Sequence, residues 1–120
     1  MTKVLVVDDD RLTRTIAVHL LGRAGRIATE ARDGREALRM LTNDMEIGTL
    51  VTDVLMPEMD GLELIQAARK LRPGLRIVAM SAGGKRVKLD LLPVARSLGA
   101  DACFQKPLSQ DTIGLVIGPV

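Results

Sequence analysis

Short apolar runs alternate with longer amphipathic segments along the whole chain. Continuous apolar runs are typical of strands covered on both faces, whereas leucines three or four residues apart are typical of helices. The pattern predicts strands at residues 3–7, 27–30, 49–53, 75–80 and 102–105. It predicts helices at residues 11–24, 35–42 and 62–71, from about residue 92 to residue 98, and at 109–117.

Polar residues and glycine at the segment ends support these limits. Asp10 and Asp60 precede the first and third helices, where a carboxylate caps exposed backbone amides. Gly25 follows the first helix, as a C-terminal cap does. Three apolar residues of the first helix fall on one face, the pattern of a side turned toward a core: Leu12, Ile16 and Leu20.

The alternation of strand and helix predicts an α/β fold with a parallel sheet, because parallel neighbours need crossover connections. Right-handed crossovers place helices on both faces of the sheet and give a three-layer sandwich. The chain has 120 residues, with no repeat and no linker-like tract. We therefore expect a single domain over residues 1–120.

Composition argues against several classes of function. Hydrophobic residues make up 47% of the chain and charged residues 27%, as in soluble globular proteins, and no apolar stretch approaches the ~20 residues that span a bilayer. The chain starts without the long apolar segment of a secretory signal, and its single cysteine cannot form an internal disulfide, so we expect a cytoplasmic protein that does not bind membranes. A net charge of +2 and the absence of Trp and Tyr argue against direct nucleic-acid binding.

Four of the apolar runs end on a group that can handle phosphate or a metal ion. These groups are Asp8 and Asp9 after the first strand, Asp53 at the end of the third, Ser81 after the fourth and Lys106 after the fifth. The ends of parallel strands lie side by side, at the edge where open α/β sheets bind ligands. We therefore expect these side chains to converge there.

A cluster of three carboxylates needs something to offset its charge, since two carboxylates about 4 Å apart repel by roughly 4 kcal/mol at an effective dielectric constant of about 20. Mg²⁺ prefers oxygen ligands and leaves positions for phosphate oxygens. With that ion bound, Asp53 can attack a phosphorus atom while Lys106 and the Ser81 hydroxyl hold the phosphoryl oxygens. The expected product is an aspartyl phosphate.

Each of these residues has a simpler role when it is taken alone. The first carboxylate pair could be solvated loop residues, Ser81 a turn residue and Lys106 a surface lysine. His19, in the middle of the first helix, is expected to have a surface or packing role. Residues 85–88 are expected to form a solvated loop, with partner docking as the alternative.

The ordered set closely resembles the receiver domain of two-component response regulators, in particular the stand-alone chemotaxis type. Residues 4–9 are similar to the acid-pair strand of that family, and residues 52–61 to its phosphoacceptor strand and following loop. Residues 81–82, 98–100 and 106–107 resemble the switch hydroxyl with its small neighbour, the end of the fourth helix, and the family's lysine and proline. The resemblance implies a flavodoxin-like (βα)5 sandwich with strand order 2-1-3-4-5.

By this resemblance, Asp53 accepts phosphate from a phosphohistidine on a sensor histidine kinase or phosphotransfer protein. Asp9, Asp53 and the backbone carbonyl of Leu55 bind Mg²⁺ directly, and Asp8 binds it through water. Leu55 and Gly83 occupy positions that modulate hydrolysis of the phosphoryl group. The domain acts as a signalling switch with autodephosphorylation, not as an enzyme with a separate substrate.

The resemblance also implies how the signal leaves the site. Lys106 pairs with the phosphoryl group, Ser81 moves to bond it, and the bond between Lys106 and Pro107 is cis. The surface of the fourth helix, fifth strand and fifth helix then meets a downstream protein target, an output domain or a second copy of the chain in a homodimer. A stand-alone regulator is expected, although an output domain could follow.

Two departures from the family pattern concern signalling. Cys103 occupies the position three residues before the lysine, where the family usually has Tyr or Phe, and Phe104 should point to the opposite face of its strand. The last helix is short and interrupted by Gly114. These departures leave open a receiver that acts only as a constitutive interaction module.

An enzyme remains a further alternative. The sequence Asp8-Asp9-Asp10 followed by Thr13 faintly resembles the DxDxT motif of haloacid-dehalogenase-type phosphatases, with Asp8 as the nucleophile. Such enzymes usually need more residues for their core and lids, and the motif gives Asp53 no role.

Overall fold

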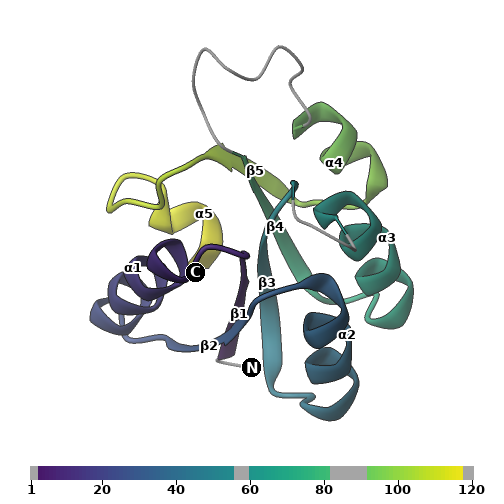
Figure 1. Ribbon diagram of the computed structural model, residues 1–120, viewed down its shortest axis with the longest axis horizontal. Helices are drawn as coiled ribbons and strands as arrows, with labels where there is room; N and C mark the ends of the chain where they lie inside the picture. Colours follow the sequence, from purple (N-terminus) through teal and green to yellow (C-terminus); the bar gives the residue numbers. More distant parts are fainter. Residues whose placement is uncertain (1–2, 56–59, 82–91, 118–120) are drawn as a thin grey trace.

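Five parallel strands form one sheet at the centre of the molecule (Figure 1). The computed structural model describes residues 3–55, 60–81 and 92–117. The strands are β1 (Lys3–Val7), β2 (Ile27–Ala31), β3 (Ile47–Asp53), β4 (Arg76–Ser81) and β5 (Ala102–Gln105). Their spatial order is β2-β1-β3-β4-β5, which confirms the three-layer (βα)5 sandwich and its expected strand order.

Helices cover both faces of this sheet. They are α1 (Arg11–Arg23), α2 (Gly34–Asn43), α3 (Gly61–Leu71), α4 (Leu92–Leu98) and α5 (Ile113–Ile117). Figure 1 shows α1 and α5 on one side and α2, α3 and α4 on the other. None of the helices in the described ranges is long and apolar enough to cross a membrane.

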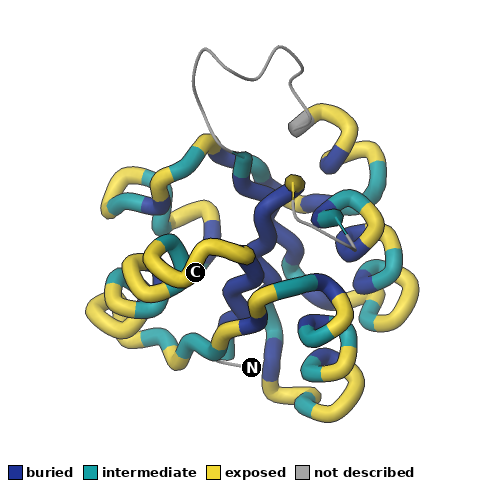
Figure 2. The backbone as a smooth tube through the Cα atoms, viewed as in Figure 1, coloured by how far each residue is buried: buried dark blue, intermediate teal, exposed yellow. Residues whose placement is uncertain are grey.

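Successive residues of each strand enter different cores, because side chains alternate between the two faces of a sheet. Val4 and Val6 pack under α1 and α5, whereas Leu5 and Val7 pack under α2, α3 and α4. The central strands β1, β3 and β4 are consequently mostly buried, and exposed residues lie on the helix surfaces, the connections and the edge strands β2 and β5 (Figure 2). This double burial explains why the strands consist of continuous apolar runs.

The predicted segment ends are confirmed closely. Asp10 caps α1 by accepting a bond from the Leu12 amide at 3.2 Å, and Asp60 caps α3 by accepting one from the Glu63 amide at 2.8 Å. Gly25 follows α1 with φ of +81°, a backbone conformation that residues with a side chain rarely adopt. The third strand begins two residues earlier than predicted, because Ile47 is fully buried and pairs with Lys3.

The inner face of α1 is not the one predicted from leucine spacing. Leu12 and Ile16 are 65% and 44% exposed, and only Leu20 of the predicted set packs against the core, next to the buried Ala17 and Leu21. The side chain of Arg14, one helical turn before Ala17, determines this orientation because it donates hydrogen bonds to Asp8 at the end of β1 and to Glu30 in β2. Positions i, i+3 and i+7 share a face of a helix, so anchoring Arg14 inward turns Ala17 and Leu21 to the sheet.

The last helix is shorter than predicted. Residues 109–112 form a turn in which the Ser109 carbonyl accepts bonds from the Thr112 and Ile113 amides at 3.2 and 2.9 Å, and α5 starts only at Ile113. Gly114 and the short apolar stretch give a longer helix little support. The sequence features at residues 56–59, Gly83 and residues 85–88 lie outside the described residues.

Candidate functional site

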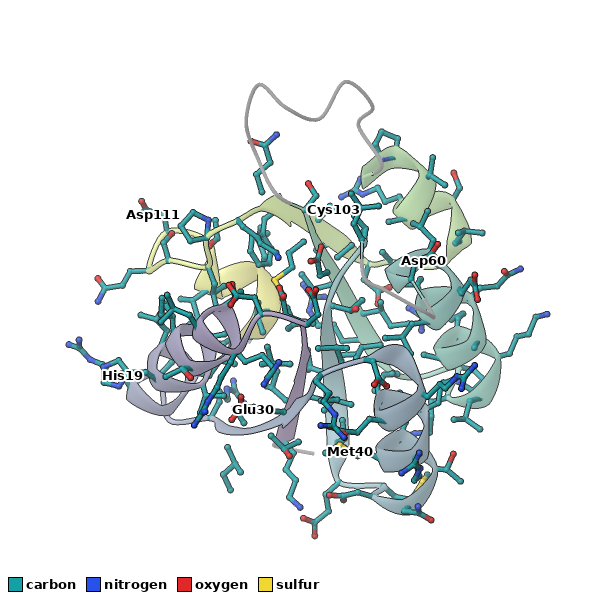
Figure 3. The ribbon with its side chains drawn as sticks, viewed as in Figure 1. His19, Glu30, Met40, Asp60, Cys103 and Asp111 are labelled. Atoms are coloured by element: carbon teal, nitrogen blue, oxygen red, sulfur yellow. The ribbon has the colours of Figure 1, made fainter. Side chains whose placement is uncertain are left out.

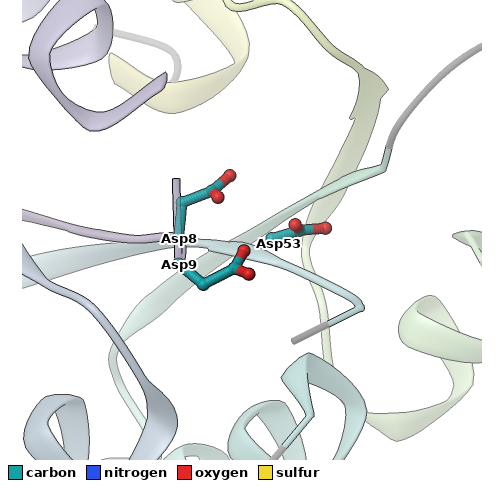
Figure 4. Close-up of side chains that lie close together, drawn as sticks. All are labelled: Asp8, Asp9 and Asp53. Carbon is teal, nitrogen blue, oxygen red and sulfur yellow. The ribbon is translucent and has the colours of Figure 1, made fainter. Parts of the chain in front are cut away.

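The carboxyl edge of the sheet brings together the side chains that the sequence placed at strand ends. Asp8 and Asp9 follow β1, and Asp53 is the last residue of the neighbouring β3. Lys106 follows β5, and its ammonium reaches back to both strands. The close-up in Figure 4 shows the three carboxylates at the ends of these two strands.

The three carboxylates are close enough to share one cation. One oxygen from each lies within 4.8 Å of the others. Asp8 is fully buried, Asp53 is 6% exposed and Asp9 is exposed. The Asp10 amide donates to Asp8 Oδ1 at 2.8 Å, and the Leu55 amide donates to Asp53 Oδ1 at 3.2 Å. Backbone amides thus fix one oxygen of each buried carboxylate.

Lys106 binds the other oxygen of each buried carboxylate. Its Nζ lies 2.5 Å from Asp8 Oδ2 and 2.8 Å from Asp53 Oδ2. Burial alone would lower the pKa of Lys106, but its bonds to Asp53 and Asp8 outweigh burial and raise this pKa, so the side chain stays protonated. One ammonium faces three carboxylates, and the site keeps an excess of negative charge.

Burial makes the ionised form of Asp53 costly. Desolvation raises the pKa of Asp53 although the Lys106 ammonium and the Leu55 amide act in the opposite direction, and the neighbouring Asp8 charge adds to the increase. A cation that binds beside Asp53 therefore stabilises the ionised form of this carboxylate. The same cost gives the metal-free protein a specific pH dependence.

We expect the metal-free protein to lose stability relative to Asp53→Asn as the pH rises. A folded pKa above the unfolded value means that the stabilising contribution of Asp53 is present below about pH 4 and is lost as the pH rises through the folded pKa. Thermal unfolding of both proteins with a chelator, between about pH 3.5 and pH 7, measures this difference. A difference that is constant with pH, or that grows in favour of the wild type, would contradict the raised pKa.

The donor set fits a hard divalent cation. Every candidate ligand is an oxygen, the ligand type that Mg²⁺ prefers. Asp8 Oδ2 is paired with Lys106, and a carboxylate oxygen has a second lone pair that can accept a metal-bound water. Asp9 is exposed at the rim, and Leu55, two residues after Asp53, is also exposed there.

Ser81 and Cys103 belong to β4 and β5, the strands on the Lys106 side of the site. Ser81 ends β4 and its carbonyl accepts a 2.7 Å bond from the Lys106 amide, but no hydrogen bond between described residues joins its hydroxyl to Asp53 or Lys106. Cys103 pairs with Ala79 and packs on the α2, α3 and α4 side, whereas Phe104 is buried on the other side, as predicted. His19 is exposed on α1 (Figure 3).

Gly61 is a positioning residue that the sequence analysis treated only as part of a turn. Its amide donates to the Val54 carbonyl at 3.1 Å, and the first turn of α3 lies directly against the end of β3. A methyl group at this position would overlap the Asp53 carbonyl oxygen and lie 2.6 Å from Val54 Cα. Only glycine permits this approach.

Three carboxylates and a lysine thus meet at one edge of the sheet, and comparison with known families decides the assignment. The sequence model of the response regulator receiver domain matches residues 4–117. The chain belongs to this receiver domain family. It is therefore a receiver domain of two-component response regulators, and the lysine-proline bond after β5 has the cis form that the resemblance implied.

Similar receivers occur both as short proteins and as parts of long ones. Sporulation initiation phosphotransferase F of Bacillus subtilis is 29% identical over 111 residues, which cover 92% of this chain and 86% of that protein. The transcriptional regulator NtrC of Azospirillum brasilense is 39% identical over 79 residues, which are 66% of this chain and 16% of that protein. Sensor histidine kinase RcsC of Escherichia coli is 33% identical over 92% of this chain, which spans 11% of the kinase.

Solved structures agree with the family assignment. The chemotaxis protein CheY4 of Vibrio cholerae superposes with a TM-score of 0.81 at 30% identity, over 94% of this chain and 92% of that one. A response regulator receiver domain from Clostridium thermocellum gives a TM-score of 0.86 at 25% identity, over 98% and 91% of the two chains. The flavodoxin-like fold is therefore confirmed, and no observation supports the phosphatase alternative.

Proposed function

We propose that this receiver domain accepts a phosphoryl group on Asp53 from a phosphohistidine of a sensor histidine kinase or phosphotransfer protein. One observation carries the proposal: Asp53 Oδ2 lies 2.8 Å from the Lys106 ammonium, in a cluster with two further carboxylates suited to a divalent cation. A nucleophilic oxygen, a cation for the phosphoryl group and a metal site are thus combined at one strand edge.

Asp53 is the attacking group in this mechanism. When bound, Mg²⁺ offsets the negative charge of the carboxylates and the phosphoryl oxygens. Asp9, Asp53 and the Leu55 carbonyl would hold the ion directly, and Asp8 would hold it through water. An Asp53 carboxylate oxygen forms the new O–P bond as the N–P bond of phosphohistidine breaks, and the histidine nitrogen leaves with the electron pair.

Lys106 and Ser81 bind the phosphoryl group once Asp53 carries it. Lys106 exchanges its bond to Asp53 for one to a phosphoryl oxygen, and the Ser81 hydroxyl turns to bond another. Because Ser81 ends β4 and Lys106 follows β5, these movements reach α4, β5 and α5. We propose that this surface binds a downstream target, an output domain or a second copy of the chain, and that residues 1–120 act as a single cytoplasmic domain.

Cys103 and the five-residue α5 favour one variant of this function. Without an aromatic side chain at position 103, the domain could present the same surface before and after phosphorylation and act as a constitutive interaction module. Amide exchange in β5 and α5, compared with and without a beryllofluoride mimic of the phosphoryl group, separates a switch from such a module.

Mg²⁺-dependent phosphorylation tests the proposal. We expect incubation with a small acyl phosphate and Mg²⁺ to add one phosphoryl group per chain, and a chelator to abolish the addition, because the uncompensated carboxylates repel the phosphoryl donor. Intact-protein mass spectrometry measures the stoichiometry. Failure to label in the presence of Mg²⁺, or equal labelling with the chelator, would count against the proposed chemistry.

A further inference from the structure

Arg14, near the start of α1, connects the end of β1 to β2 through its side chain. Its side chain is 14% exposed, Nη1 donates to the Asp8 carbonyl at 2.6 Å, and Nε donates to Glu30 Oε1 at 3.1 Å. Glu30, labelled in Figure 3, belongs to β2. The planar fork of a guanidinium can hold both acceptors at once.

The Asp8 carbonyl needs this donor because the β1–β2 ladder ends beside it. The Asp8 amide still bonds to the Ala31 carbonyl at 3.3 Å. A parallel ladder would next bond the Asp8 carbonyl to the Asp33 amide, but Asp33 is already the N-cap of α2 and no hydrogen bond joins these two groups. Within residues 3–55, 60–81 and 92–117, Arg14 supplies the only hydrogen bond to the Asp8 carbonyl. Since Asp8 is fully buried, losing that donor would leave a buried acceptor unsatisfied.

This carbonyl belongs to the peptide group that joins Asp8 to Asp9. Rotation of that peptide would move Asp9, whose carboxylate is exposed at the rim, relative to the fixed Asp8 carboxylate. From this placement we infer that Arg14 is a positioning residue, which holds the two carboxylates in the relative orientation that binds Mg²⁺. The inference rests on the proposed metal site, and it assigns Arg14 no contact with the ion.

Electrostatics alone predicts the opposite effect of removing Arg14. A positive charge near a cation site weakens cation binding, so Arg14→Gln should strengthen Mg²⁺ binding if only its charge matters. If Arg14 orients the carboxylates, the same change should weaken binding. The direction of the change therefore distinguishes positioning from charge.

The test measures Mg²⁺ dissociation constants by titration followed with amide NMR resonances, and unfolding temperatures in chelator. We expect Arg14→Gln to weaken Mg²⁺ binding about tenfold, as is typical when a group that orients a metal ligand is lost. Arg14→Lys, which keeps the charge but reaches one acceptor at a time, should lose less affinity. It also serves as the folded variant if Arg14→Gln does not fold.

Two arginines provide matched controls. Arg32→Gln removes a charge that is 75% exposed and lines the same surface pocket as Arg14, and it should leave Mg²⁺ affinity unchanged or slightly higher. Arg72→Gln removes a guanidinium that donates to the Leu41 and Ile47 carbonyls, contacts with residues outside the carboxylate cluster. It should lower the unfolding temperature while Mg²⁺ affinity stays within about twofold of wild type.

The outcomes separate this inference from the proposed function. Weaker binding in Arg14→Gln, with both controls near wild type, supports positioning. Wild-type or stronger binding in Arg14→Gln overturns it, and so does an equal loss in Arg72→Gln, which would reflect general destabilisation. Wild-type protein that binds no Mg²⁺ at all would instead refute the metal site on which the inference rests.

Discussion

Asp53→Asn is expected to reduce acyl-phosphate labelling from one phosphoryl group per chain to background. The amide keeps the shape of the side chain and can still accept the bond from the Leu55 amide, but it lacks an anionic oxygen to attack phosphorus. It also removes the ion pair of Lys106 Nζ with Asp53 Oδ2, whose atoms lie 2.8 Å apart. Intact-protein mass spectrometry after reaction with acyl phosphate and Mg²⁺ measures the loss.

A neighbouring carboxylate gives a matched control for this substitution. Asp60 caps α3 through the Glu63 amide, and Asn caps helices about as well as Asp, so Asp60→Asn should fold and label like the wild type. Stoichiometric labelling of Asp53→Asn at the original rate would refute Asp53 as the acceptor. Loss of labelling in Asp60→Asn would show that labelling responds to any nearby change of charge. The loss in Asp53→Asn would then no longer identify Asp53 as the acceptor.

Gly61→Ala is expected to destabilise the domain by about 3 kcal/mol, at the upper end of what overpacking usually costs. The added methyl group would overlap the Asp53 carbonyl oxygen, and backbone atoms cannot turn aside as the tip of a flexible side chain can. Either α3 or the end of β3 must move, so labelling of Asp53 should slow as well. Urea unfolding followed by circular dichroism, with the rate of labelling, measures both effects.

Gly22→Ala is the control for the change of residue type. Gly22 also lies in a helix, but nothing comes within 4 Å of a methyl group placed there. Alanine should therefore stabilise the domain by roughly 0.5 to 1 kcal/mol, the usual difference in helix propensity. A Gly61→Ala protein as stable as the wild type would show that α3 does not need its close contact with the end of β3.

The sequence pattern was sufficient to predict the three-layer α/β class and the place of the acidic site because both follow from order along the chain, whereas the strand order came from the family resemblance. Apolar runs of strand length identify buried strands, and parallel strands bring their carboxyl ends to one edge wherever those runs end on Asp8, Asp53 or Lys106. The capping roles of Asp10 and Asp60 were equally local. The strand and cap assignments depend on neighbours only a few residues away, and the convergence of the strand ends then follows from the parallel arrangement of the sheet.

Features that depend on the approach of distant segments could not be predicted. The contact of Gly61 with the end of β3 requires the distance between α3 and the sheet, and a glycine after an N-cap also occurs where there is no such contact. The inward turn of Arg14 depends on Glu30 and on where β2 leaves β1. The spacing of apolar residues in α1 was therefore not sufficient to identify its inner face: Leu12 and Ile16 are exposed, and only Leu20 of that set packs against the core.

Locating the phosphoryl group in the labelled protein tests the central claim most directly. Borohydride reduces an aspartyl phosphate to homoserine with release of inorganic phosphate, so peptide mass spectrometry after reduction identifies the residue that was modified. The account predicts the reduced residue at position 53, formed only when Mg²⁺ was present during labelling. Reduction at Asp8 or Asp9, with position 53 unmodified, would contradict it.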